Sequence, residues 1–283
     1  MIFVNSFWSK PLLKNKFGSF EQSLMTTLFS FTMSAEMVRA FGHDIILYTD
    51  RYGKELLEVA PYTDIVVIDI NEDESEHFAA QIKFEALKRM ELGQVHIDGD
   101  MFLWKRGIYD IIENANEDIL YSTYEDNNYL TKQHPLYTKF NKMINKLSVI
   151  EYEYPYRLPT MNELCWPNTS MMKINSQELK DDYIKQYEYH KSKLQNIDFE
   201  NTWPDIIIEQ YFLELLCKNK NYTTKEAIEN FRENEQLAVD LGFAHLGSVK
   251  NTKINLATDW IRQNDSERYN SIINIINKQR ELH

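Results

Sequence analysis

The first hundred residues alternate between short apolar runs and longer stretches in which apolar residues recur every three or four positions. The apolar runs cover residues 2–7, 44–50, 64–70 and the segment that leads into Asp98. Short runs bounded by polar residues predict buried strands, and the periodic stretches between them predict helices. A repeated strand, helix, strand order indicates an α/β domain with a mainly parallel central sheet flanked by helices.

The first helix of this series is defined at both ends. Ser19 and Gln22 have the spacing of a capping box at its start, and Gly42 follows its last turn. The apolar runs at 44–50 and 64–70 are almost unbroken, which predicts strands that are buried on both faces.

The second half of the chain mixes strands and helices. Strands are expected at 119–124 and 168–174 because apolar and β-branched residues gather there. Thr223 and Glu226 have the spacing of another capping box, which predicts a helix that ends at Leu241.

The end of the chain is predicted to be a helical tail. We divide the chain into a domain over 1–251 and this C-terminal tail over 252–283. The tail carries an apolar side that packs on the sheet domain or, alternatively, contacts a partner or a membrane surface: Ile272, Ile273, Ile275 and Ile276.

The composition is that of an acidic globular protein. The 283 residues include 43 acidic and 31 basic ones, for a net charge of −12. Phosphate affinity comes from clustered lysine and arginine, so this balance argues against a nucleic-acid partner. An anionic ligand therefore needs a metal ion or a local basic group to offset the repulsion.

The sequence also indicates a cytoplasmic location. Cys165 and Cys217 are too few for a disulfide framework and are expected to be reduced. The N-terminal residues lack the pattern of a signal peptide, and no stretch approaches the roughly 20 apolar residues of a transmembrane helix. The oligomeric state does not follow from the sequence.

Asp98, Gly99 and Asp100 interrupt an apolar segment with two carboxylates. Side chains two apart on a strand point the same way, so both carboxylates are expected to reach one ion. Gly99 leaves room for a ligand to approach the backbone. Oxygen ligands of this kind suit Mg²⁺ or Mn²⁺, whereas the alternative is a solvated polar turn.

Two further segments, 5–8 and 48–50, lie at the carboxyl ends of predicted strands, as Asp98 to Asp100 do. In an open α/β sheet, ligands bind beyond the carboxyl ends of the strands. The segments 5–8, 48–50 and 98–100 are therefore expected to meet at one binding site.

With these motifs the sequence resembles the type-A nucleotide-sugar glycosyltransferases, which have the GT-A fold and an Asp-X-Asp metal motif, and within them families 8 and 32. Four segments carry the resemblance in the family's order: VHIDGDMFLW, WPNTSMMKIN, IIEQYFLELL and FAHLGSVKN. They lie within residues 2–250, which is most of the chain.

The sequence departs from the family patterns at two places. In family 8 the last motif has the spacing H-x-x-G-x-x-K, whereas His245, Gly247 and Lys250 are one residue tighter, and Asn251 replaces the usual proline. Family 32 enzymes carry paired glycines before the metal strand, whereas this chain has Gly93 alone.

The resemblance implies a metal site and a catalytic pair. Asp98, Asp100 and His245 are the implied metal ligands, and Lys250 would meet the diphosphate. Glu209 and Gln210 match the acidic-glutamine pair beneath the donor sugar. Glu209 would act as a general base in an inverting enzyme, or would stabilise the oxocarbenium-like state or act as the nucleophile in a retaining one.

Further donor contacts are implied, each with a structural alternative. Asp50 would bind the ribose or cap the following helix. Phe7 or Trp8 would stack on uracil or pack in the core. Lys83 would approach the donor or lie on a solvated helix face. Asn168 would contact the sugar.

Together these features predict a metal-dependent glycosyltransferase that moves a hexose from a UDP-sugar to a glycan or glycolipid acceptor, of the bacterial surface-polysaccharide type. Two alternatives remain. A catalytically silent sugar- or nucleotide-binding module would keep the same fold without turnover. A nucleotidyltransferase is disfavoured because it needs a glycine-rich phosphate loop after the first strand, where this chain has Asn5 to Lys10 without glycine.

Overall fold

The protein is described by a computed structural model. It describes residues 1–14, 19–71, 74–125, 135–148, 158, 160, 166–194, 204–229, 231, 235–246 and 250–282.

A seven-stranded sheet forms the centre of the molecule, in the order β3-β2-β1-β4-β7-β6-β8. Four parallel strands make up one half, and β7 pairs antiparallel with β4 and β6. The last strand, β8, is parallel to β6. The predicted α/β fold with a mainly parallel sheet is therefore confirmed. The strand bounds are β1 Ile2–Phe7, β2 Asp44–Thr49, β3 Asp64–Val67, β4 Val95–Ile97, β6 Ile119–Glu125, β7 Trp166–Ile174 and β8 Thr224–Glu226.

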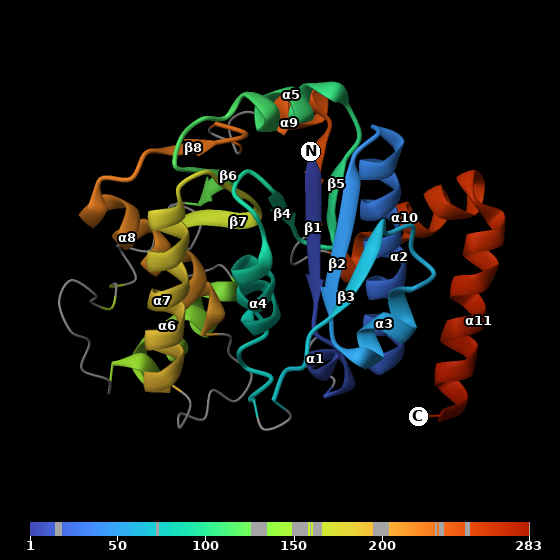
Figure 1. Cartoon of the computed structure of the whole chain (residues 1–283). Helices are drawn as coiled ribbons and strands as arrows, with labels where there is room; N and C mark the ends of the chain where they lie inside the picture. Colours follow the sequence, from blue (N-terminus) through green and yellow to red (C-terminus); the bar gives the residue numbers. More distant parts are fainter. Residues whose placement is uncertain are drawn as a thin grey trace.

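Helices cover both faces of this sheet, which makes three layers (Figure 1). On β1, Val4 packs on the side of α4, α7 and α8, whereas Phe3 packs on the side of α2 and α5, because neighbouring strand residues point to opposite faces. The helix bounds are α1 Ser9–Leu13, α2 Phe20–Ala40, α3 Arg51–Leu57, α4 Gln81–Arg89, α5 Arg106–Asn114, α6 Pro135–Leu147, α7 Gln177–Leu194, α8 Phe212–Lys220, α9 Glu235–Leu241, α10 Lys250–Asn264 and α11 Ser266–Leu282.

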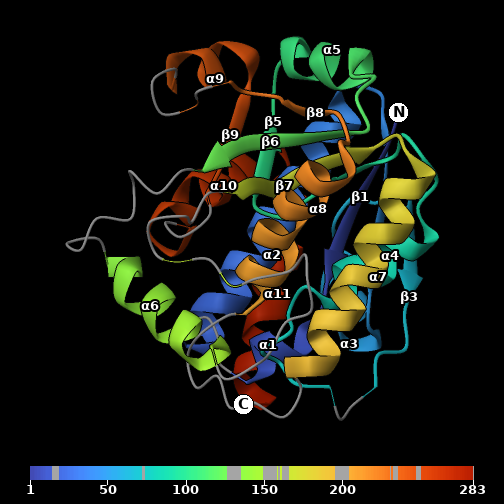
Figure 2. The same cartoon turned by 90° about the vertical axis from the view of Figure 1, so that its left-hand side faces the viewer.

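A second, two-stranded sheet joins distant parts of the chain. Strand β5, Met101–Leu103, pairs antiparallel with β9, Phe243–His245, and Met101 lies opposite His245. The helices that follow β5 and precede β9, α5 and α9, lie together at one end of the molecule (Figure 2). This pairing brings the segment that contains His245 next to the Asp98–Asp100 turn.

The first helix begins as its capping box predicts. The Ser19 side chain caps α2 by accepting a hydrogen bond from the Gln22 N–H, and Gly42 adopts a positive φ of 78° just after the helix. Strand β2 is mostly buried as predicted, but β3 is not, because it forms the edge of the sheet and exposes Asp64 and Val67.

The second predicted capping box is wrong. Thr224–Glu226 forms β8, and the Thr223 N–H and Oγ1 both donate to the Asp118 carboxylate at 2.8 Å. A helix does precede Leu241, but it begins only at Glu235. This segment forms a strand because it pairs with the edge of β6. The pairing gives its backbone N–H and C=O groups the hydrogen bonds that a helix would have formed internally.

The C-terminal tail consists of two helices, and both pack on α2. Ile272 and Ile276 are buried against that helix, whereas Ile273 and Ile275 are partly buried. The apolar side of the tail therefore packs on the sheet domain as predicted. The division of the chain after residue 251 stays a prediction. In the described part of the chain, no helix combines the length and apolar character that crossing a membrane requires.

Candidate active site

The two carboxylates of the Asp-Gly-Asp triplet lie in a tight turn between β4 and β5. The Met101 N–H donates to the Asp98 carbonyl at 3.0 Å, and the Asp98 N–H donates to Ser170 on β7 at 2.6 Å. The expected arrangement along a strand end is thus wrong, since β4 ends at Ile97. The turn nevertheless brings the two side chains together.

Gly99 is required by a close aromatic neighbour. A Cβ atom at this position would lie 2.2 Å from the Phe31 ring on α2. The ring occupies the space that a larger residue would need, so any other residue at this position would have to displace the Phe31 side chain.

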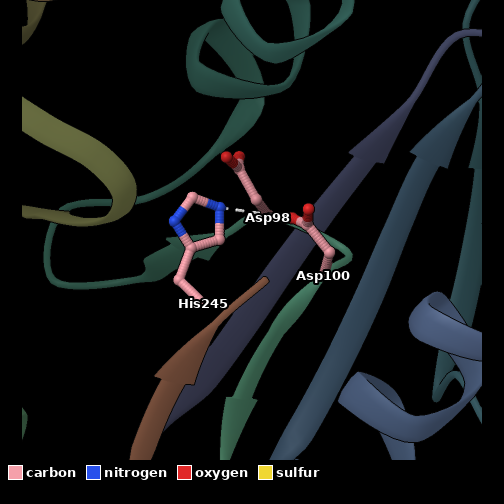
Figure 3. Close-up of side chains that lie close together, drawn as sticks. All are labelled: Asp98, Asp100 and His245. Atoms are coloured by element: carbon pink, nitrogen blue, oxygen red, sulfur yellow. Dashed lines mark ion pairs between the residues drawn. The ribbon is translucent and has the colours of Figure 1, made fainter. Parts of the chain in front are cut away.

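His245 completes a cluster with the two aspartates. Its Nε2 lies 3.4 Å from Asp100 Oδ1, and one potential ligand atom from each of the three residues lies within 4.8 Å of the others (Figure 3). Asp98 and Asp100 come from the turn, while His245 ends β9 on the facing strand. Two carboxylates and an imidazole at these separations can share one divalent cation.

The cluster is electrostatically stressed. Burial raises the pKa of Asp98 to about 6; the ammonium of Lys83 opposes this shift and the charge of Asp100 adds to it. The Asp98 side chain still exposes 39% of its surface. Two like charges held this close favour binding of a cation, which would relieve their repulsion.

His96 lies beneath the cluster on β4 and is fully buried. Burial, with the nearby Lys83 charge, lowers the pKa of His96 well below its usual value, so the ring is neutral at pH 7. One ring nitrogen, Nε2, is hydrogen-bonded to the Ser6 hydroxyl at 2.9 Å, and Nδ1 lies 4.0 Å from Asp98 Oδ1. The contact with Asp98 is therefore not an ion pair.

Lys83 and Glu209 form a buried ion pair next to Asp98. The Lys83 ammonium donates to Glu209 Oε1 and, at 2.7 Å, to the Thr169 carbonyl, and it lies 3.9 Å from Asp98 Oδ1. Burial alone would lower the pKa of Lys83, but the carboxylates of Glu209 and Asp98 outweigh it and raise the pKa. The solvated-face alternative for Lys83 is wrong, since the residue is only 5% exposed.

Glu209 sits on a short π-helix, Ile206–Tyr211, that leads into α8. Such wide turns are frequent at functional sites, because the extra residue changes where a side chain points. Here the Glu209 carboxylate also accepts from Thr169 Oγ1 at 2.5 Å, and its backbone carbonyl accepts from the Tyr183 hydroxyl at 2.9 Å. Among the described residues, both hydrogen bonds to the Glu209 side chain fall on Oε1 and none falls on Oε2.

A cavity of about 310 Å³ opens beside these groups. Its lining includes four carboxylates, those of Asp98, Asp100, Asp205 and Glu209, with Lys83 as the one cation among the described lining residues. A cavity of this size and mixed polarity is typical of a small-molecule site.

Some of the other predicted site residues line the same cavity. Phe7 and Trp8, at the end of β1, are both buried and contribute to its wall, so core packing and ligand contact are compatible for them. Phe7 also makes an edge contact with Phe31, with ring centroids 5.3 Å apart.

Asp50 has the capping role that was its alternative. It accepts from the Gly53 N–H at 2.8 Å, as the N-cap of α3, and from the Ser9 hydroxyl at 2.6 Å. It lines a neighbouring cavity of about 620 Å³, which shares Trp8 with the first.

Two further predicted residues, Asn168 and Gln210, are absent from the lining of the first cavity as described, as are Asp50 and His245. Asn168 on β7 donates to Glu125 at 2.6 Å, and Gln210 is half-buried but absent from the cavity wall. Lys250 begins α10, and its side chain lies outside the described part of the chain. Their ligand-binding roles stay predictions.

The cavity also contains residues that the motifs did not indicate. The main group is a row of hydroxyl side chains on α2, at Ser23, Thr26, Thr27 and Ser30. Their spacing of three and four residues is the signal that could have identified them, because it places them on one helical face. Asp205 was also missed, and it accepts from the Ala80 N–H at 2.9 Å.

A family model described as "Family of unknown function (DUF6734)" matches residues 1–275. The chain belongs to the DUF6734 family. No curated protein matches this DUF6734 member significantly in sequence.

Solved structures of similar arrangement are known. One is the glycosyltransferase GlyE of Streptococcus pneumoniae, with 12% identity and a TM-score of 0.38, where the alignment covers 89% of this chain and 51% of GlyE. The DUF6734 chain thus spans about half the length of that protein.

Two more likenesses are similarly distant. The galactosyltransferase LgtC, solved with donor and acceptor sugar analogues, has 11% identity and a TM-score of 0.41, with 90% of this chain and 83% of LgtC covered. The 4-diphosphocytidyl-2C-methyl-D-erythritol synthase of Anaerococcus prevotii has 12% identity and a TM-score of 0.36, with coverages of 81% and 88%. Likenesses this distant carry no conclusion about the activity of the DUF6734 member.

Proposed function

We propose that this protein is a metal-dependent glycosyltransferase that moves a hexose from a UDP-sugar to a glycan or glycolipid acceptor. The observation that carries the proposal is the Asp98, Asp100 and His245 cluster at the edge of a cavity that also contains Glu209. A metal-ligand set at the edge of a cavity and a buried carboxylate on its wall fit a reaction in which a diphosphate is the leaving group.

The residues present fit Mn²⁺ or Mg²⁺. Two carboxylates supply hard oxygen ligands, and the imidazole of His245 favours Mn²⁺ of the two. When bound, the ion would offset the negative charge that accumulates on the departing diphosphate. Burial raises the pKa of Asp98 and the charge of Asp100 adds to the shift, so a divalent cation would stabilise both carboxylates in their ionised form.

Glu209 is the proposed catalytic carboxylate. Its Oε1 is held by Lys83 and Thr169, which fixes the side chain, so Oε2 is the oxygen that would face the reacting sugar. It would accept the proton of the acceptor hydroxyl in an inverting reaction, or stabilise positive charge at the anomeric carbon in a retaining one.

Lys83 is proposed as a positioning residue, in place of the direct donor contact that the resemblance implies. Its ammonium is already engaged by Glu209 and by the Thr169 carbonyl. It would hold the Glu209 carboxylate in one orientation while also lying close to Asp98.

Isothermal titration with UDP in the presence of MnCl₂ tests the proposal. We expect the wild-type protein to bind UDP only with the metal, and the Asp98→Ala plus Asp100→Ala variant to lose that binding. The matched control is Asp240→Ala, which removes an exposed carboxylate on α9. Equal binding by the double variant would rule out the metal role.

Turnover separates the proposal from the silent-module alternative. UDP release is measured for several UDP-sugars with glycan acceptors, in wild type and in Glu209→Gln. Metal-dependent UDP binding without release from any donor would favour a binding module over an enzyme.

A further inference from the structure

Helix α2 presents a row of hydroxyl groups to the cavity. Ser23, Thr26, Thr27 and Ser30, which we call the hydroxyl wall, all line it. Residues three and four apart share one face of a helix, so this face is polar over two successive turns. The same helix packs its other sides against α10 and α11.

The hydroxyl wall is buried although it is polar. Ser23, Thr26 and Ser30 are 5%, 3% and 2% exposed. Among the described residues, Ser23 Oγ has no hydrogen-bond partner, and Ser30 Oγ reaches only the Thr27 carbonyl, at 3.5 Å. A buried hydroxyl without a partner is costly to the fold, and a ligand in the cavity would supply the missing partner.

The charged residues of the cavity lining restrict the charge of such a ligand. Asp98, Asp100, Asp205 and Glu209 contribute carboxylates there, and the Lys83 ammonium is already held by Glu209 and Thr169. A divalent cation on the aspartate pair would bind the diphosphate, so its charge would not offset a second anionic group on the ligand. A further anionic group on the ligand would meet uncompensated carboxylates.

We infer that the hydroxyl wall of α2 recognises the transferred sugar and that this sugar is an uncharged hexose. The inference rests on the proposed function. Sugar hydroxyls would exchange hydrogen bonds with Ser23 and Thr27 and would donate to the carboxylates of the cavity lining. Phe7 and Phe31, which also line the cavity, offer apolar surface to the C–H face of the ring.

The test compares variants that remove hydroxyls at and away from the cavity. Ser23→Ala plus Thr27→Val deletes two groups of the hydroxyl wall with little change of shape. Thr32→Val plus Ser34→Ala is the matched control, because both residues are buried on α2, neither lines the cavity, and their hydroxyls have no hydrogen-bond partner in the described part of the chain. Thr27→Val alone, at a half-buried position, covers the case in which the double variant fails to fold.

Isothermal titration with Mn²⁺ then uses UDP, UDP-glucose, UDP-galactose and UDP-glucuronic acid as probes. For wild type we expect at least one of the two neutral UDP-hexoses to bind more tightly than UDP, and UDP-glucuronic acid to bind roughly tenfold or more weakly than that hexose. The cavity variant should lose about fivefold or more of the affinity for the hexose conjugate, and about twofold for Thr27→Val alone, while affinity for UDP is retained. The control should match wild type for all four probes.

The outcomes separate this inference from the proposed function. If wild type binds UDP but the cavity variants keep full affinity for the UDP-hexose, or if UDP-glucuronic acid binds as well as the neutral conjugates, the inference is overturned alone. If wild type does not bind UDP with Mn²⁺, the proposed function fails and the inference fails with it.

Discussion

The Asp98→Asn variant should make the metal-free protein more stable while abolishing metal binding. The folded state raises the pKa of this carboxyl from 3.8 to about 6, so ionising it costs folding free energy. Two units correspond to about 3 kcal/mol at neutral pH. Because the side chain is 39% exposed, solvent screening reduces the gain expected for asparagine to about 1–2 kcal/mol.

The pH dependence of this gain has a definite sign. The folded carboxyl holds its proton more tightly than the unfolded one, so its contribution to stability is full below pH 3.8 and is lost as pH rises through 6. The stability difference between Asp98→Asn and wild type should therefore grow from about pH 4 to pH 6 and then stay constant.

Urea denaturation in EDTA at pH 4.5 and pH 8 measures this difference, with Asp240→Asn as the exposed control. Adding Mn²⁺ at about 100 times its dissociation constant should stabilise wild type by about 2.7 kcal/mol and leave Asp98→Asn unchanged, which reverses the order of stability. Equal or lower stability of Asp98→Asn in EDTA at pH 8 would refute the claim that the cluster is stressed without a cation.

Three further perturbations test the surroundings of the site. Lys83→Met should destabilise the fold by about 3 kcal/mol, because it leaves the Glu209 carboxylate buried without its cation, and adding Glu209→Gln should restore most of the loss in urea denaturation. Gly99→Ala should cost about 1–3 kcal/mol by collision with the Phe31 ring, and less in a Phe31→Leu background. Burial lowers the pKa of His190 to about 3, so between pH 7 and pH 5 the unfolded ring binds a proton that the folded ring does not. The free energy of unfolding of wild type should therefore fall by about 2 kcal/mol over this range, and that of His190→Phe by correspondingly less. An equal fall in both proteins would contradict this.

Local patterns determined the elements of the parallel half. The apolar runs and the Ser19 capping box depend on near neighbours in the chain, so β1, β2 and α2 lie where the sequence predicts them. The Asp-Gly-Asp triplet likewise predicted a metal site, because two carboxylates one residue apart interrupt an apolar segment. The resemblance supplied His245 and Glu209, which spacing alone would not have joined to the triplet.

Tertiary contacts decided what local patterns could not. Thr223 to Glu226 reads as a capping box, but β6 offered a strand edge and the segment paired with it. Thr169 on β7 accepts from Lys83 and donates to Glu209 Oε1, and β7 is distant in sequence from both residues. The sequence places the residues of the hydroxyl wall on one face of α2, but only the tertiary structure shows that this face lines a cavity.

The sequence by itself therefore determined the α/β architecture and the carboxylate pair, since hydrophobic periodicity and short-range chemistry act over a few residues. Only the tertiary structure decided which side chains share the cavity with that pair. Long-range packing buries Asp98, which raises its pKa, and it brings the carboxylates of Glu209 and Asp98 next to Lys83, which raises the pKa of Lys83.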